Sequence, residues 1–304
     1  LLCCFLLVPP PLRFGMEIKM AGTLYLCATP IGNLEDITMR VLRILEEADV
    51  IAAEDTRQSV KLLNHYGIRT PLVSYHEHNK REKTPLLVRR LLEGENIALV
   101  TDAGTPAISD PGEDLVRACY EAGVEVTSLP GASAVITALA LSGMKARRFT
   151  YEGFLPVDKK ERALVLERLQ KSTCTTIFYE APHRLVRTLR LLAETVGNDR
   201  PAAICKELTK KHESAQHLTL GEAVSYYEKQ EPRGEFVLII EGADPGELRR
   251  EKETAWKEVP LEQHMEKYMA EGMDKKTAMK AVAKDRGVSR REIYAALIKG
   301  KAGV

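Results

Sequence analysis

Small, turn-forming and acidic residues are concentrated in a few loops of the N-terminal half of this 304-residue chain. The densest is 101–112, TDAGTPAISDPG, in which Asp102 can accept a hydrogen bond from a hydroxyl or a cationic group. Its glycines carry no side chain, so backbone amides can approach a bound molecule closely. In the short loop LPGAS, Gly131 and Ala132 leave room for a planar ring against the backbone. These loops favour a ligand-binding site over ordinary surface turns.

The loop 29–38, TPIGNLEDIT, follows the first expected strand but lacks the glycine fingerprint of dinucleotide-binding proteins. The sequence also has no Walker loop, so a phosphate cradle at the start of a helix is disfavoured. Asn33 and Asp36 can bind a polar partner at the sheet edge. An ordinary turn, with Asp36 or Thr38 capping the next helix, explains the spacing equally well.

Charged residues also follow expected strands. Glu54, Asp55 and Arg57 end the second strand, and buried charges without a use are costly, which favours a functional role over plain helix capping. In the C-terminal half, the segments 179–184, YEAPHR, and 206–213, KELTKKHE, have the same position. Because polar groups gather at the ends of two sheets, we expect a site between the two halves.

A metal site is not expected. His76 and His78 alternate along a strand, so only one can face a given site, whereas zinc needs about four ligands. The six cysteines are spread along the chain without a Cys-x-x-Cys pair, which disfavours both a zinc site and a disulfide framework. Most of them are expected to be buried apolar residues in a reducing compartment.

The elements that position these loops alternate regularly within residues 21–145. Short apolar runs predict strands at 24–28, 50–53, 72–75, 97–101 and 124–129. Helices are expected between and after them at 38–47, 57–66, 84–93 and 133–141, with a further helix opened by a cap at Asp110. This alternation predicts an α/β domain with a parallel sheet covered on both faces and ligands beyond the carboxyl ends of its strands.

A second α/β domain, 146–243, is expected to have a mixed sheet, because more of its strands follow one another without a helix. Strands are predicted at 149–155, 175–179, 202–206, 216–220 and 236–240. Helices are predicted at 159–170, 184–196 and 221–229. The fold class is therefore α/β, with two such domains.

The two ends of the chain differ from these domains. We expect residues 1–20 to be a non-native or disordered tail, because their apolar run is too short to span a bilayer and no signal-peptide cleavage site is evident. The segment 244–258 is highly charged without apolar periodicity, which predicts a linker. Three short helical patterns in 259–304, with a capping box from Ser289 to Glu292, predict a small helix-turn-helix module.

Charge is distributed unevenly. The whole chain has a formal charge of only +1, and its 44% apolar and 29% charged residues are typical of an ordinary globular protein. Residues 272–304 nevertheless hold nine lysines or arginines against three acids, which gives this segment a charge of +6. Such a cluster can contact a phosphate backbone, or it can be a solvated helical surface.

Seven motifs occur in order between residues 28 and 213: ATPIGNLEDIT, AAEDTR, SYHEHN, TDAGTPAISDPG, LPGAS, YEAPHRL and KELTKKHE. Together they resemble the ribosomal RNA small-subunit methyltransferase I family, within the tetrapyrrole methylase superfamily, over residues 22–242. Each motif alone is modest, but seven in one order are highly specific. The terminal helical module resembles the helix-turn-helix appendage of that family. Ala132 stands where many relatives carry proline, and it keeps the same space open.

The resemblance implies two α/β domains with S-adenosylmethionine held in the cleft between them. It implies a cytoplasmic homodimer, without a membrane partner, that methylates the ribose 2′-hydroxyl of cytidine 1402 in the 16S rRNA of the 30S subunit. By analogy with donor contacts in the superfamily, the cofactor is assigned to nine loop residues: Pro30, Asp102, Gly104, Thr105, Ile108, Gly131, Ala132, Tyr179 and Leu208.

A ribose hydroxyl is a weak acid, so a base or a nearby cation must help to remove its proton. The candidate catalytic residues are those that end strands: Asp55, Lys206 and Glu207. The candidate RNA-binding residues are Arg57, His183 and Arg184. Two other functions stay open, namely a methyltransferase for a tetrapyrrole such as a corrin precursor, and a non-catalytic RNA-binding protein of ribosome assembly.

Overall fold

The computed structural model describes residues 20–301, so the expected tail at 1–20 lies outside the described residues apart from Met20. The chain divides into two units. One comprises residues 20–137 together with Leu208–Lys211, and the other comprises Ala138–Glu207 together with 212–301. The division falls within a helix, before the boundary at 145 that the sequence suggested.

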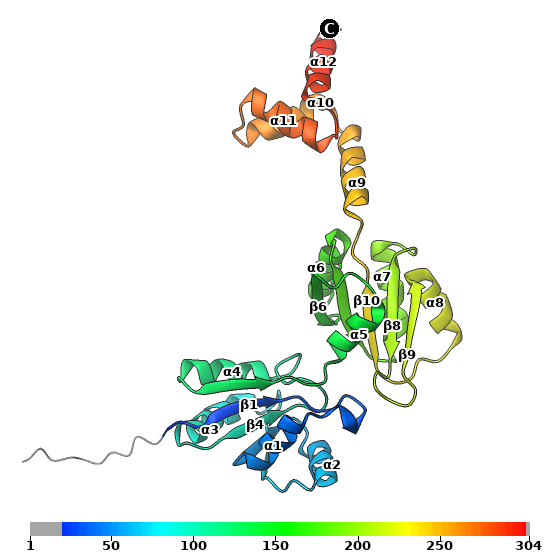
Figure 1. The fold of residues 1–304 in the computed structure, drawn as a ribbon. Coiled ribbons are helices and arrows are strands. Elements are labelled where there is room, and N and C mark those ends of the chain that lie inside the picture. The colour runs from blue at the N-terminus through cyan, green and yellow to red at the C-terminus, as the bar shows by residue number, and fades with distance from the viewer. Residues whose placement is uncertain (1–19, 302–304) are drawn as a thin grey trace, which may run out of the picture. The chain divides into compact units, whose positions relative to one another are not determined.

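The first unit contains a five-stranded sheet in the order β3-β2-β4-β1-β5. Figure 1 labels two of its strands, β1 and β4. Its strands are β1 (Thr23–Cys27), β2 (Val50–Ala53), β3 (Leu72–Ser74), β4 (Ile97–Val100) and β5 (Glu125–Leu129). Its helices are η1 (Leu34–Asp36), α1 (Met39–Glu47), α2 (Thr56–Tyr66), α3 (Lys80–Leu92), α4 (Gly112–Glu121) and α5 (Ala134–Ser142), the last of which contains the division. All pairings are parallel, which confirms the predicted sheet.

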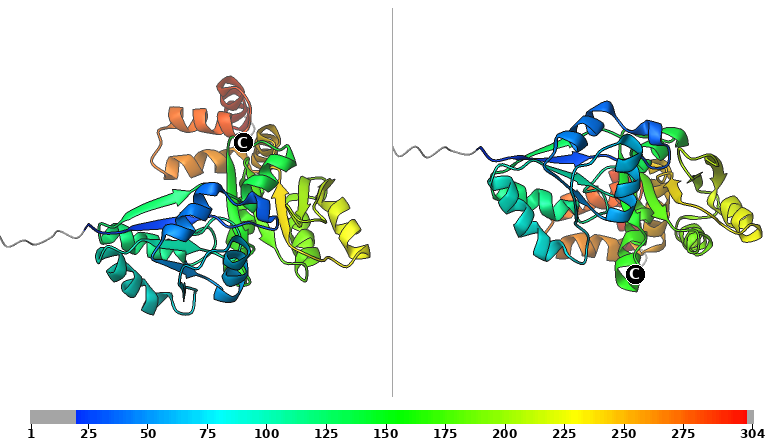
Figure 2. Two further views of the ribbon diagram at one scale, coloured as in Figure 1. Left: turned by 60° about the horizontal axis from the view of Figure 1, so that its bottom comes forward. Right: turned by 90° about the horizontal axis from the view of Figure 1, so that it is seen from below.

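Strand residues alternate between two buried faces of this sheet, because successive side chains of a strand point in opposite directions. On β4, Ile97 and Leu99 pack with α3 and α4, whereas Ala98 and Val100 pack with α1 and α2. Figure 2 shows helices on both sides of the sheet. Apolar packing occupies both faces, so polar chemistry is left to the strand ends and the loops.

The second unit contains a five-stranded sheet in the order β6-β7-β10-β8-β9. Its strands are β6 (Phe149–Phe154), β7 (Thr175–Glu180), β8 (Pro201–Lys206), β9 (Ser214–Thr219) and β10 (Phe236–Ile240). Only β6 and β7 pair in parallel, and the other pairs are antiparallel, so the predicted mixed sheet is confirmed. The helices α6 (Lys159–Lys171), α7 (Leu185–Val196) and α8 (Leu220–Lys229) supply apolar side chains to its core.

The C-terminal part consists of the helices α9 (Pro245–Glu258), α10 (Leu261–Ala270), α11 (Lys275–Asp285) and α12 (Arg290–Lys301). The segment expected as a linker is thus helical in α9. Its start is fixed by Asp244, which accepts hydrogen bonds from the amides of Gly246 and Glu247, and by a proline in the first turn. A solvated helix needs no apolar stripe, so apolar periodicity could not predict it.

Helix α3 begins at Lys80, four residues before the expected start at 84. The turn before it is closed by Asn79, whose side chain accepts a hydrogen bond from the amide of His76. The Lys80 ammonium then pairs with Glu77 and Asp114 at 2.8 and 2.7 Å. The start of this helix is therefore set by polar contacts, which the spacing of hydrophobic residues does not predict.

Among residues 20–301, no helix is both long and apolar enough to cross a bilayer.

Candidate active site

Polar loops meet at the carboxyl edge of the first sheet. Strand β4 pairs with β1 and β2, and β1 pairs with β5, all in parallel. The loops after β1, β4 and β5 therefore leave the sheet side by side, and the loop after β2 lies beside the one after β4. Open parallel sheets bind ligands at this edge.

Three of these loops are tied together by hydrogen bonds. Thr29 and Gly104 exchange two amide-to-carbonyl hydrogen bonds of 2.9 and 3.0 Å, which join the loops after β1 and β4. The hydroxyl of Thr105 donates to the carbonyl of Ala132 at 3.1 Å, which joins the loops after β4 and β5. Thr105 thus binds a neighbouring loop through its side chain, a role that its position in the motif did not predict.

Two glycines allow this convergence. Gly104 has a φ of 87°, which is a left-handed backbone that favours glycine. A Cβ at Gly131 would lie 2.7 Å from the Cβ of Ala28, closer than two carbon atoms can approach. A larger residue would therefore strain the backbone at Gly104 and would collide with Ala28 at Gly131.

The loop after β4 is strained and is held by a carboxylate. Ala107 and Ser109 have φ values of 66° and 69°, although neither is a glycine. Asp110 accepts hydrogen bonds from the amides of Ala107, Ile108 and Gly112 at 3.0, 3.1 and 2.8 Å, and burial raises its pKa. The sequence predicts Asp110 as a helix cap, but the cap position of α4 is Pro111, and Asp110 folds the loop instead.

Among residues 20–301, non-glycine residues with left-handed backbones occur only in this loop and at Glu207 and Thr209. Such backbones cost free energy and cluster at functional sites, where the surrounding structure maintains them. The side chain of Ile108 is about half exposed beside the strained residues, at 47%. The strain therefore marks the same loops that the motifs singled out.

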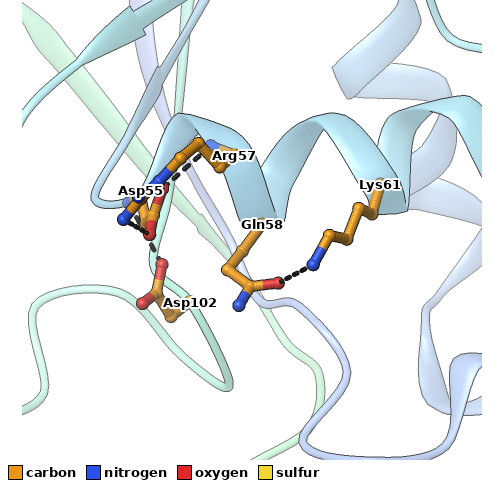
Figure 3. Close-up of polar contacts among 5 residues, drawn as sticks. All are labelled: Asp55, Arg57, Gln58, Lys61 and Asp102. Atoms are coloured by element: carbon orange, nitrogen blue, oxygen red, sulfur yellow. Dashed lines mark hydrogen bonds and ion pairs between the residues drawn. The ribbon is translucent and has the colours of Figure 1, made fainter.

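Asp55 is the N-cap of α2 and is fully engaged (Figure 3). Its carboxylate accepts hydrogen bonds from the amide of Arg57 at 2.9 Å and from the Nε and Nη2 of the same guanidinium at 3.1 and 2.8 Å. The amide of Asp55 donates to Oδ1 of Asp102 at 3.1 Å. The Arg57 guanidinium lowers the pKa of Asp55 to about 2, so Asp55 is a weak base.

Asp102 has the opposite electrostatic setting. Partial burial, and then the negative charge of Glu54, raise its pKa above the ordinary value. Oε2 of Glu54 accepts a hydrogen bond of 2.7 Å from the hydroxyl of Thr101. Asp102 itself is exposed, so one of its oxygens can meet a ligand while Oδ1 holds Asp55.

The segment Leu208–Lys211 belongs to the first unit and packs on the loop after β1. The amide of Asn33 donates to the hydroxyl of Thr209 at 3.1 Å. A Cβ at Gly32 would lie 2.4 Å from Cγ of Lys210 and 3.1 Å from the carbonyl oxygen of Leu208. Leu208, which the sequence assigned to the cofactor, is therefore in the unit that holds Pro30, Asp102 and the other assigned loop residues except Tyr179.

Lys206 and Glu207 end β8 in the second unit. Lys206 is half-buried and lies opposite Phe236 of β10. Glu207 has a φ of 52°, its amide donates to the carbonyl of Glu235, and its Oε1 accepts from the amide of Glu235, both at 2.9 Å. A strained backbone therefore fixes the direction of the Glu207 carboxylate.

The other assigned residues of this unit follow β7. Tyr179 contacts the rings of Tyr151 and Phe154 edge-on, with centroids 5.2 and 5.8 Å apart. His183 is exposed. Arg184 donates to the carbonyl of Leu155 and lies 3.4 Å from the buried Glu180, so its guanidinium is largely committed to the fold.

The first unit offers what a sulfonium nucleoside cofactor needs. Backbone groups of three loops converge at glycines, Ile108 supplies exposed apolar surface, and Asp102 supplies a carboxylate for hydroxyl or ammonium groups. The residues present thus fit S-adenosylmethionine. No three His, Cys, Asp or Glu side chains come together as metal ligands within the described residues.

A model of the family described as tetrapyrrole (corrin/porphyrin) methylases matches residues 23–224. The fold is also that of a solved uroporphyrin-III C-methyl transferase from Thermus thermophilus, complexed with S-adenyl homocysteine. That structure has a TM-score of 0.53 and 20% identity, and the match covers 72% of this chain and 97% of that chain. The class defined by the fold and the loops is therefore that of the tetrapyrrole methylases.

Curated relatives narrow this class. The chain is 52% identical to the ribosomal RNA small subunit methyltransferase I of Halalkalibacterium halodurans, over 90% of this chain and 93% of the relative. It is 48% identical to the protein of the same name from Bacillus subtilis, over the same shares of the two chains. The chain belongs to the tetrapyrrole methylase family and, within it, to the ribosomal RNA small subunit methyltransferase I family.

Proposed function

We propose that this chain is an S-adenosylmethionine-dependent methyltransferase that methylates the ribose 2′-hydroxyl of cytidine 1402 in 16S rRNA. The observation that carries the proposal is the 52% identity to a ribosomal RNA small subunit methyltransferase I along nearly the whole chain. The converging loops of the first unit, with their strained backbones, support it from the structure.

S-adenosylmethionine supplies an electrophilic methyl group on a positively charged sulfur. Pro30, Gly104, Gly131 and Ala132 would hold it through the backbones of the three loops, and Ile108, Tyr179 and Leu208 would supply apolar contacts. Asp102 would accept a hydrogen bond from its hydroxyl or ammonium groups. Thr105 has an indirect role, because its hydroxyl positions the carbonyl of Ala132.

The protein must align the ribose oxygen and take up its proton. Of the three candidates, Glu207 takes the proton, since Asp55 is a weak base with a pKa of about 2. The positive charge of Lys206, the preceding residue, stabilises the negative charge that develops on the ribose oxygen. Asp55 instead holds the guanidinium of Arg57 toward the RNA.

RNA phosphates are bound by exposed cations of both units. Arg57 is 88% exposed although it is paired with Asp55, and Lys61 follows one helical turn later on α2 (Figure 3). The exposed His183 adds a further contact. Arg184 has a positioning role, because its guanidinium donates to the carbonyl of Leu155 and pairs with the buried Glu180.

The test is methyl transfer from labelled S-adenosylmethionine to 30S subunits, followed by mapping of the modified nucleotide. Label on the ribose of cytidine 1402 is the expected result. Label on a corrin precursor instead of RNA would establish a tetrapyrrole methyltransferase. Donor binding without transfer to any rRNA would establish a non-catalytic assembly protein.

We further propose a homodimer that acts on ribosomal subunits in the cytoplasm. Sedimentation of the purified chain tests the dimer.

A further inference from the structure

Helices α11 and α12 carry many exposed cations. Six of them lie in the part of the module whose side chains are described: Lys275, Lys276, Lys280, Lys284, Arg290 and Arg291. None of the six forms a close ion pair with another described side chain. Their charged groups are therefore exposed to solvent and can meet a partner.

The acids of the same two helices and their flanks are all engaged elsewhere. Asp274 caps α11 by accepting from the amide of Thr277 at 2.7 Å. Glu292 completes a capping box by accepting from the amide of Ser289 at 2.7 Å. Asp285 accepts hydrogen bonds from Tyr268 and His264. The acids thus shape the helices and form no close ion pair with the six lysines and arginines.

The cations are arranged in order along the two helices. Lys276, Lys280 and Lys284 stand four residues apart, so they form one row with steps of about 6 Å along the axis of α11. A nucleic-acid strand carries about one charge per 3.4 Å of its axis, so the row spans roughly three or four phosphates. Arg290 and Arg291 begin α12, and Tyr294, 57% exposed, follows Arg290 by one turn.

A buried polar network holds the helices that present this surface. His264 is fully buried and stacks on Trp256 of α9, with ring centroids 3.7 Å apart. It lies between Asp285 and Arg286, each 3.2 Å from one of its ring nitrogens. The preceding helix α10 exposes Glu262 and Glu266 beside Lys267. The cations of α11 and α12 are thus presented on a fixed scaffold.

We propose that α11 and α12 form an RNA-binding surface that contacts small-subunit rRNA away from the methylated nucleotide. The lysine row of α11 binds consecutive phosphates, and Tyr294 stacks on an unpaired base next to the arginines of α12. RNA is the occupant because the surface combines uncompensated cations with an exposed aromatic ring. The inference rests on the proposed function, since that function brings rRNA to this chain.

The experiment compares the wild-type chain with the triple variant Lys276→Gln, Lys280→Gln and Lys284→Gln, using 30S subunits and a protein-free 16S rRNA transcript as probes. Affinity for the transcript should fall about tenfold at low salt, and the slope of log K against log salt should fall by about 2–3. The KM for 30S subunits should rise while kcat stays the same. Tyr294→Ala should weaken binding without changing the salt slope, because stacking releases no counterions.

The matched control removes the same charge from three separate elements, by Lys160→Gln, Lys229→Gln and Lys257→Gln. These lysines are exposed, and none takes part in an ion pair within the described residues, but they form no row. The control should keep wild-type affinity for the transcript. An equal loss in the control would overturn the proposal, because bulk charge would then explain the effect.

Other outcomes separate this inference from the proposed function. If the wild type methylates 30S subunits but the triple variant binds RNA as tightly, the surface assignment is wrong and the function stands. If the wild type transfers no methyl group to rRNA, the function itself fails. A triple variant that binds the transcript normally but has lost binding to 30S subunits would reveal a protein partner instead. A change in sedimentation with unchanged RNA affinity would identify an interface between two copies.

Discussion

Asp55 and Glu207 both end strands, yet their surroundings suit them to different tasks. Asp55 accepts three hydrogen bonds from Arg57, which stabilise its ionised form. Oε1 of Glu207 accepts a hydrogen bond from the amide of Glu235, and its own backbone is left-handed. Protonation of Asp55 would disrupt its ionic contacts with Arg57, so we propose Glu207 and not Asp55 as the proton acceptor.

Glu207→Gln should therefore lower kcat for 30S methylation by about 10²- to 10⁴-fold. Glutamine keeps an oxygen that can accept the Glu235 amide, so the loop should keep its shape. Single-turnover methylation at saturating donor and subunit concentrations measures the effect. Unchanged turnover, with unchanged donor affinity, would exclude Glu207 as the base.

Asp55→Asn should act on RNA binding and not on chemistry. Asparagine can still cap α2, but it loses the ionic contact with Arg57, so the KM for 30S subunits should rise about two- to fivefold at constant kcat. The folded pKa of about 2 lies below the ordinary 3.8, so the stability from this pair is present above pH 3.8 and is lost as pH falls toward 2. The effect of the variant should therefore be constant throughout the neutral range, and a fall in kcat would restore Asp55 as a base.

At the scale of single residues, the sequence indicated which loops matter but not which role each residue has in them. The composition of the segments after the strands was enough to single out the loops that contain Asp102, Gly104 and Gly131. That Thr105 holds a carbonyl and Asp110 folds its own loop depends on backbone conformations that residue types do not specify. An aspartate before Pro-Gly suits a cap and a loop equally well, so spacing alone could not separate the two.

Among the elements, the contact between the loop after β1 and the segment Leu208–Lys211 depends on Gly32. Gly32→Ala should displace Leu208 and lower kcat/KM about 10- to 100-fold, since catalysis is sensitive to shifts of about 1 Å. Gly123→Ala is the control: its φ of 71° makes alanine unfavourable by about 1 kcal/mol, but no atom lies within 4 Å of the added carbon. Steady-state kinetics and thermal unfolding compare the two variants. Equal losses of activity would contradict a local role for Gly32.

The helical module should lose stability in mild acid. Burial lowers the pKa of His264 below its ordinary 6.5, so the unfolded chain takes up a proton first as pH falls. Stability is therefore complete above pH 6.5 and declines below it, and the unfolding temperature should drop by roughly 4–8 °C for each kcal/mol lost. Trp256, the only tryptophan in the chain, stacks on His264 and reports this unfolding by fluorescence.

The control for this experiment is His264→Gln, which retains a donor and an acceptor but does not titrate. Its unfolding temperature should depend less on pH between about 8 and 5.5 than that of the wild type. Asp285, Arg286, Lys267 and Tyr268 also face His264, and their charges enter both proteins equally. An identical pH dependence in the two proteins would show that His264 does not control it.

The elements were largely predictable, because apolar runs and caps record which residues must be buried. The strands β2 and β10 match the expected ranges at both ends. Helix α9 was missed because its stability comes from the Asp244 cap and from ion pairs such as Arg249 with Glu253, not from an apolar stripe. Trp256 of α9 stacks on His264 of α10. The sequence of one helix alone does not predict such a contact with another helix.

In the whole molecule, the charge is divided between parts that have separate cores. Residues 272–304 carry +6, which leaves −5 for the rest of the chain because the total is +1. The module has its own buried cluster, which includes Met265, Met279 and Ile293, apart from the clusters of the two sheets. An acidic catalytic part needs another source of attraction to a polyanionic substrate.

A chain truncated after Asp244 should therefore separate donor binding from RNA capture. Ala243 is buried and donates its amide to Ser172, so this end point leaves the second sheet domain complete. Calorimetry should give wild-type affinity for S-adenosylmethionine, because the donor residues all precede the cut. The KM for 30S subunits should rise at least tenfold and lose most of its dependence on salt, because the uncompensated cations are gone. If the truncated chain keeps the full salt dependence, the cations that capture rRNA lie in the α/β part, around Arg57 and Lys61, and the module has another purpose.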